Sequence, residues 1–162
     1  MSTTPTPTTQ AKALLADWEP AHPPLPPALR QAFLQHVAEV LGYKDSTLDS
    51  EDVRYTLGQA DQLGLGWAKA SGTGRATALL TEVLSQLPGV PTPTGRQLVS
   101  FSSDPNATLD MDELTLILEG LQQRVGPEWE MIFGHNDTPR QQPEVHLLVL
   151  QASDAPDQTP AA

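Results

Sequence analysis

The sequence predicts an α+β domain with a four-stranded mixed sheet: three parallel strands and an antiparallel last strand, packed with helices and preceded by a long helix. Strand-like and helical segments alternate through most of the chain, a pattern typical of parallel strands joined by right-handed crossovers. The connection before the last strand-like segment is too short for a crossover, so that strand is expected to run antiparallel. The length of 162 residues suits one such domain with a buried core.

Proline content divides the chain into three parts. Residues 1–27 form a Pro/Thr-rich N-terminal tail, which we expect to be loose because proline removes backbone donors and favours extended chain. Two helical turns are expected within it at 11–18, with Trp18 contacting either a partner or, more simply, the domain itself. Residues 28–152 form the domain. Residues 153–162, rich in Pro, Asp and Ala, form a flexible C-terminal tail.

The domain is expected to begin with two helices. The first covers 28–41, because its apolar residues recur at spacings of three and four, and it stops at Gly42. After a polar loop at 45–51, Asp49 or Ser50 caps a second helix that runs to about residue 63. Asp52 lies in the positively polarised first turn of that helix.

The remaining segments alternate between strand and helix. They are a strand at 64–70, a helix at 75–87, a strand at 96–102, a helix at 111–125, a strand at 130–134 and a last strand at 144–152. Asp110 and Glu113 form a capping-box pattern at the start of the last helix. The apolar run from Leu147 to Leu150 favours an interior strand that is covered on both faces.

Charge and composition exclude several classes of function. The net charge is −11 with nine Lys and Arg residues, which argues against nucleic acid and anionic membrane surfaces as partners. There are no cysteines, so disulfides and thiolate metal sites are excluded. The sequence has no apolar run of about 18–20 residues for membrane insertion and no secretion signal, so we expect a cytoplasmic location.

Four stretches occur in the same order as in FtsZ, the bacterial tubulin homologue. Residues 48–54 (LDSEDVR) resemble that family's Asn-x-Asp-Phe-Ala-Asp-Val loop. Residues 63–76, 98–110 and 132–152 resemble its next strand and turn, the strand and helix that follow, and its closing hairpin. The chain therefore resembles the C-terminal domain of the FtsZ/tubulin family. The resemblance implies a mixed sheet with two helices on one face, joined to the helix that connects the two domains of FtsZ.

The family's GTP-binding half has no counterpart in these residues. FtsZ binds GTP through a Gly-Gly-x-Thr-Gly-x-Gly loop in an N-terminal domain, and this loop is absent from the 162 residues. We therefore expect no cofactor and no enzyme activity in cis. Ser71-Gly72-Thr73-Gly74 lacks the Lys-Ser/Thr of a phosphate loop and is interpreted as a turn.

The resemblance assigns candidate site residues to the loop at 47–54. In FtsZ filaments the carboxylates that match Asp49 and Asp52 reach the nucleotide of the adjacent subunit and help to position water, so these two are candidate trans-acting carboxylates. Thr47 and Arg54 complete the candidate partner-binding set. Thr47 and Ser50 depart from the family's Asn and Phe. The alternative is that Asp49 and Asp52 only cap a helix, and this is slightly favoured.

The four histidines are isolated in the sequence and have no partner at metal-ligand spacing, so no metal site is predicted. The function expected first is an interaction module that docks on FtsZ or a related GTPase filament subunit at the division site and caps or modulates assembly. The alternative is an orphan, self-associating scaffold domain with no filament contact. An unrelated enzyme on the same scaffold has no nucleophile–base pair to support it.

Overall fold

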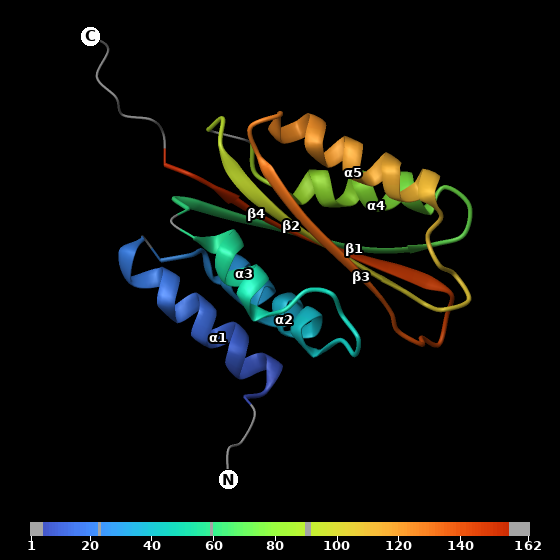
Figure 1. Cartoon of the computed structure of the whole chain (residues 1–162), viewed down its shortest axis with the longest axis horizontal. Coiled ribbons are helices and arrows are strands. Elements are labelled where there is room, and N and C mark those ends of the chain that lie inside the picture. Colours follow the sequence, from blue (N-terminus) through green and yellow to red (C-terminus); the bar gives the residue numbers. More distant parts are fainter. Residues whose placement is uncertain (1–4, 23, 59, 90–91, 156–162) are drawn as a thin grey trace.

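The computed structural model describes residues 5–22, 24–58, 60–89 and 92–155, arranged as helices on both faces of one sheet (Figure 1). The elements are α1 (Pro7–Trp18), the 3-10 turn η1 (Glu19–Ala21), α2 (Pro27–Gly42), α3 (Ser50–Leu57), β1 (Gln62–Ser71), α4 (Arg75–Gln86), β2 (Gly95–Ser103), α5 (Met111–Val125), β3 (Glu130–Asp137) and β4 (Glu144–Ser153). Within the described ranges, no helix is long and apolar enough to cross a membrane.

The sheet has the strand order β1-β4-β2-β3, which confirms a mixed sheet of four strands. β4 is antiparallel to both of its neighbours, β1 and β2, and only β2 and β3 pair in parallel. The strands β1, β2 and β3 point the same way, but they do not form a parallel block, because β4 lies between the first two. This pairing differs in detail from the largely parallel sheet that the alternation of elements suggested.

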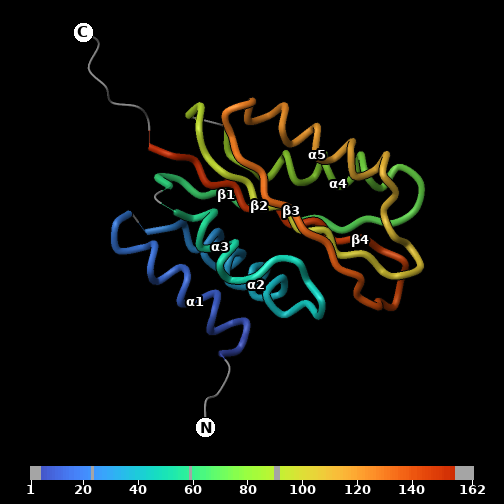
Figure 2. Tube along the Cα trace, viewed as in Figure 1, coloured from blue at the N-terminus to red at the C-terminus, as the bar shows by residue number. Residues whose placement is uncertain are grey.

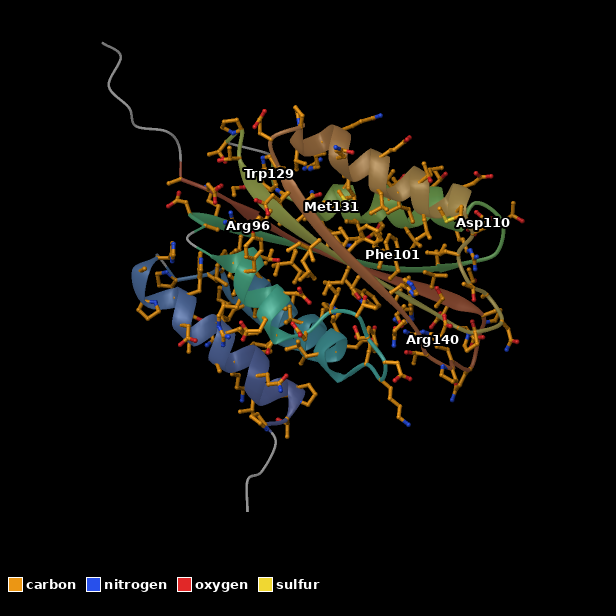
Figure 3. All side chains as sticks on the ribbon, viewed as in Figure 1. Arg96, Phe101, Asp110, Trp129, Met131 and Arg140 are labelled. Atoms are coloured by element: carbon orange, nitrogen blue, oxygen red, sulfur yellow. The ribbon has the colours of Figure 1, made fainter. Side chains whose placement is uncertain are left out.

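The expected closing hairpin is wrong, because β3 and β4 are separated by β2. The connection at 138–143 passes over the end of β2 instead, as the trace in Figure 2 shows. Arg140, labelled in Figure 3, fixes this crossing: its backbone N–H donates to Asp104 Oδ2 at 2.8 Å and its Nη2 donates to Ser102 Oγ at 2.6 Å. The backbone N–H of Thr138 donates to the Ser103 carbonyl at 2.8 Å.

Two hydrophobic cores lie on the two faces of the sheet. On one face, α4 and α5 cover residues such as Val99, Phe101 and Val149. On the other face, α2 and α3 cover residues such as Leu98, Leu148 and Leu150, and α1 packs on the outside of α2 and α3. Leu147 and Leu148 thus face opposite cores, which confirms that the last strand is an interior strand buried on both sides.

The N-terminal segment differs most from expectation. We predicted a loose tail over 1–27, but Pro7–Trp18 forms α1, and its apolar side chains join the core with α2 and α3. The Trp18 ring is 5% exposed and its Nε1 donates to the Ala60 carbonyl at 3.1 Å, so Trp18 packs back onto the domain. Residues 1–4 and 23 of that predicted tail lie outside the described ranges.

Apart from α1, most element boundaries lie within two residues of the predicted ones, but β3 extends to Asp137 rather than ending at residue 134. α3 ends at Leu57 rather than near residue 63, because Gly58 takes a positive φ of 44° and ends the helix. The predicted tail over 153–162 begins inside the sheet: Ser153 belongs to β4, and Asp154 accepts a hydrogen bond from Arg96 Nη2 at 2.7 Å. Residues 156–162 lie outside the described part of the chain.

Candidate functional site

The loop between α2 and α3 lies directly on β3, an edge strand of the sheet. A Cβ atom on Gly134 would collide with Thr47 Oγ1 and would lie 2.6 Å from Leu48 Cγ, so only glycine lets the loop approach this closely. Leu48 is buried in the core below the loop. Close packing on β3 and burial of Leu48 therefore fix the position of the candidate site residues.

Asp49 and Asp52 form a reciprocal capping box at the start of α3. The backbone N–H of Asp52 donates to Asp49 Oδ1 at 3.1 Å, and the backbone N–H of Asp49 donates to Asp52 Oδ2 at 2.9 Å. These bonds satisfy backbone donors that the first turn of a helix leaves free. Helix capping is one of the two roles that the sequence offers for Asp49 and Asp52, and both carboxylates make capping hydrogen bonds.

Each of these carboxylates keeps one oxygen outside the capping box. Among the described residues, neither Asp49 Oδ2 nor Asp52 Oδ1 accepts a hydrogen bond, and the Asp49 side chain is exposed. Arg54 is exposed on α3 and donates to Glu51 one turn before it. Thr47 is exposed and lies against Gly134. The four predicted residues thus lie on one short segment, on which Thr47, Asp49 and Arg54 are exposed and Asp52 is half-buried.

Asp49→Ala is expected to lower the free energy of unfolding by about 0.5–2 kcal/mol, because it removes the side-chain acceptor of the cap. Asp49→Asn is the matched control: asparagine caps a helix as well as aspartate does, so its stability is expected to stay near that of the wild type. Urea unfolding of both variants measures the difference. Equal stabilities for the alanine and asparagine variants would contradict the capping role.

A second polar cluster, which was not predicted from the sequence, joins α2 to the sheet around Trp67. The Trp67 ring stacks on His36 at a centroid distance of 4.7 Å and contacts His146 edge-on at 5.4 Å. His146 is hydrogen-bonded to Glu144 Oε1 at 3.0 Å. These side chains come from α2, β1 and β4. The sequence therefore shows only neighbours within one element, such as Glu144 and His146 on β4, and does not show that the elements meet.

Glu39 on α2 is the electrostatic centre of this cluster. Its Oε1 accepts a hydrogen bond from the Tyr43 hydroxyl at 3.0 Å, and its carboxylate lies 3.7 Å from His146 Nδ1 and 3.9 Å from His36 Nδ1. The imidazoles, that of His146 first and then that of His36, hold the pKa of Glu39 well below its usual range, although burial opposes this effect. Burial, followed by the charge of Glu39, raises the pKa of Tyr43.

This arrangement fixes α2 on the sheet and offers little to a substrate. The side chains of His36 and His146 are 13% and 12% exposed, and the Glu39 carboxylate is already shared among three neighbours. Over the described ranges, no group of three or more His, Asp or Glu side chains is placed to hold a metal ion. His36 and His146 therefore pack between α2 and the sheet.

Glu39→Gln is expected to destabilise the protein more at pH 6 than at pH 3. The folded-state pKa of Glu39 lies below its unfolded value, so its charge stabilises the fold above about pH 4.3, and this contribution is lost as the pH falls toward the folded-state pKa. Urea unfolding at both pH values measures it, with Glu119→Gln on the exposed side of α5 as the control. A loss of stability that is the same at both pH values would contradict this assignment.

The glycine-containing segment Ser71-Gly72-Thr73-Gly74 consists of the last residue of β1 and the turn from Gly72 to Gly74 that leads into α4. Gly72 and Gly74 have φ angles of 77° and 76°, which side-chain-bearing residues rarely adopt. The guanidinium of the adjacent Arg75 is bound to Glu113 at 2.7 and 2.9 Å, and it also donates to the carbonyls of Ala107 and Thr108. This cation ties α4 to α5, which supports the interpretation of the segment as a turn rather than a phosphate loop.

Comparisons with known proteins find similarity in structure only. No protein-family model and no curated protein matches the sequence. A mutant FtsZ from M. jannaschii is similar with a TM-score of 0.61 and 17% identity, over 82% of this chain and 42% of that one. TubZ from Bacillus thuringiensis serovar israelensis, solved as GDP-form protofilaments, is similar with a TM-score of 0.62 and 14% identity, over 91% and 42%.

CetZ from Methanosaeta thermophila is similar with a TM-score of 0.54 and 16% identity, over 78% of this chain and 38% of that one. The chain therefore spans about two-fifths of the length of each of these proteins. This coverage is consistent with a likeness to their C-terminal domain alone. The similarity confirms the fold that the sequence resemblance implied: the described chain has the fold of part of the FtsZ, TubZ and CetZ chains.

Proposed function

We propose that this protein is an interaction module that docks on a GTPase filament subunit of the FtsZ type and limits assembly of the filament. The observation that carries the proposal is the segment with Thr47, Asp49, Asp52 and Arg54, held on β3 at the position that the FtsZ resemblance gives to the contact with the next subunit. A fold that TubZ uses in protofilaments supports the same type of contact. These 162 residues contain no GTP-binding signature loop, so a bound module made of these residues alone would offer no nucleotide face to another subunit.

A GTPase contribution of this module would act in trans. Asp49 Oδ2 and Asp52 Oδ1 are the oxygens that remain outside the capping box, and either could accept a hydrogen bond from water beside a partner's nucleotide. A group that positions water acts mainly in the transition state, so its loss lowers turnover more than binding. The capping box would hold both carboxylates in place for this role.

Sedimentation of the FtsZ-type GTPase of the same organism, with increasing amounts of this protein, tests the proposal. We expect substoichiometric protein to shorten filaments and to co-sediment with them. Asp49→Asn and Asp52→Asn are expected to keep binding and to lower GTP turnover of the mixture, whereas Asp112→Asn, on the exposed start of α5, should change neither. Because asparagine preserves the helix cap, both variants are expected to stay folded, so a fall in GTP turnover would not be caused by unfolding.

Two results would contradict parts of this proposal. Unchanged polymer in the pellet with no co-sedimentation at equimolar protein would remove filament docking and would leave self-association as the alternative. Docking with unchanged turnover in both asparagine variants would remove the trans-acting role and would leave Asp49 and Asp52 as capping residues only.

A further inference from the structure

β1 is the edge strand on the side of the sheet opposite to β3 and the loop at 47–54. Its partner on one side is β4, and its other side carries no strand in the described part of the chain. A free strand edge presents backbone donors and acceptors that can pair with a further extended chain. The surface beside β1 is therefore separate from the segment that the proposed function uses.

The side chain of Gln86 shows which backbone groups of β1 face outward. The Trp67 N–H donates to Gln86 Oε1 at 2.7 Å, and Gln86 Nε2 donates to the Trp67 carbonyl at 3.0 Å. In an antiparallel ladder, residues whose N–H and C=O face the partner alternate with residues whose groups face away. Leu63 and Leu65 lie four and two residues before Trp67, so their N–H and C=O groups also point away from β4. Within the described part of the chain, these backbone groups make no hydrogen bond.

An apolar groove of about 570 Å³ lies along this part of the edge. Trp18, Leu25 and Leu29 line it on the side of α1 and α2, and Leu87 and Pro88 line it at the end of α4. The backbone of Leu63 to Leu65 therefore lies between two apolar walls. Gln86 closes the edge at Trp67, so the open stretch is short and has a defined end.

The apolar side chains on both sides of the groove limit the kind of chain that can pair with the edge of β1. A second copy of the sheet would bring helices on both of its faces, and these would meet the walls, whereas a single extended peptide fits between them. Asp61, one residue before β1, is the one ionisable residue among the described residues that line the groove. In a protein with a net charge of −11, this carboxylate favours a basic group on the ligand.

We propose that the edge of β1 binds an extended peptide segment of a partner protein, which adds as an antiparallel strand beside Leu63 and Leu65. Apolar side chains of the peptide occupy the two walls, and a Lys or Arg at its C-terminal end pairs with Asp61. Backbone hydrogen bonds supply affinity in this mode of recognition, and the pockets for side chains supply specificity. Gln86 sets the register, because it occupies the backbone groups that the next peptide residue would use.

An NMR titration of the full chain with the probe peptide Ac-Thr-Thr-Val-Val-Val-Thr-Lys-NH2, whose successive valines present apolar side chains to both walls, tests this site. We expect shift changes along β1 and slower hydrogen exchange at the amides of Leu63 and Leu65. A peptide with Glu in place of Lys, and one with Pro in place of the central Val, are expected to bind about tenfold more weakly or worse. Proline removes a backbone donor, so the second control separates strand pairing from simple apolar contact.

Three variants of the protein sharpen the test. Leu29→Glu and Asp61→Lys are each expected to weaken binding about tenfold, which corresponds to about 1.4 kcal/mol. Gln86→Ala frees the Trp67 backbone, so it should tighten binding and extend protection to the Trp67 amide. Gln123→Ala, an exposed position on α5, is the matched control and should leave binding unchanged.

Three results would overturn the proposal: no protection at Leu63 and Leu65 with any of the peptides, equal binding of the proline peptide, or no effect of Gln86→Ala and Asp61→Lys. Protection that rises with protein concentration in the absence of peptide would identify a second copy as the occupant and would also overturn it. Filament sedimentation does not depend on this edge, so failure of the one hypothesis leaves the other intact.

Discussion

Replacing Trp18 by Ala is expected to lower the free energy of unfolding by about 3–5 kcal/mol, the usual cost of removing a buried aromatic side chain. The ring is 5% exposed, stacks on His22 at 3.9 Å and belongs to the core that α1 shares with α2 and α3. Its Nε1 also donates to the Ala60 carbonyl at 3.1 Å, so the substitution removes a buried hydrogen bond as well. Thermal and urea unfolding of the full chain measure the change.

Two further variants separate the causes of this loss. Trp18→Phe keeps much of the apolar contact and removes the donor to Ala60, so an intermediate loss is expected. Lys12→Ala changes an exposed residue of the same helix and should alter stability by about 0.5 kcal/mol or less. If Trp18→Ala costs no more than Lys12→Ala, α1 does not pack in solution and the loose-tail interpretation is correct.

The helical spacing of apolar residues in α1 can be seen in the sequence, but the high proline content of residues 1–27 led us to expect a loose tail. Ala11, Leu14, Leu15 and Trp18 are spaced as one face of a helix. The prolines of this segment flank the helix instead of interrupting it, and Pro7 occupies the first helical position, where no backbone donor is needed. Counting prolines over 27 residues therefore limited the expected helix to two turns at 11–18, whereas the structure has a helix of 12 residues.

Patterns within a short stretch of sequence predicted the individual helices and strands. α2, α5 and β4 follow from apolar spacing, capping residues and a continuous apolar run, and the structure confirms all three. The strand order could not be predicted in this way. A connection of this length can form a hairpin or cross the end of one intervening strand, and contacts of Arg140 with Asp104 and Ser102, far apart in sequence, favour the crossing.

The candidate site shows the same division between local and long-range information. The capping box depends on two residues three positions apart, so the sequence indicated a capping role for Asp49 and Asp52 as one of two alternatives, without the reciprocal bonds. The cluster of His36, Glu39 and His146 forms because α2 and β4 lie next to each other beside Trp67. The spacing of these residues in the sequence does not show that the two elements are neighbours. Long-range meetings of this kind follow from the fold and not from residue spacing.

Ile117→Ala is expected to lower the free energy of unfolding by about 2–5 kcal/mol, and Leu118→Ala by less. In the sequence, the spacing of Leu114, Leu118, Leu121 and Val125 predicts that Leu118 lies on the apolar stripe of α5. In the structure the Ile117 side chain is fully buried against the sheet, whereas Leu118 is only partly buried at the margin of the same core. A difference of one position rotates a helix by about 100°, so the stripe read from the sequence was centred to one side of the buried face.

Urea unfolding of the two variants measures this difference, with Leu148→Ala and Gln123→Ala for comparison. Leu148 is 3% exposed in the core on the opposite face of the sheet, so it should cost about as much as Ile117. Gln123 is exposed on α5 and should change stability by about 0.5 kcal/mol or less. A loss at Leu118 equal to or larger than that at Ile117 would show that α5 is rotated on the sheet, toward the orientation that the sequence pattern suggested.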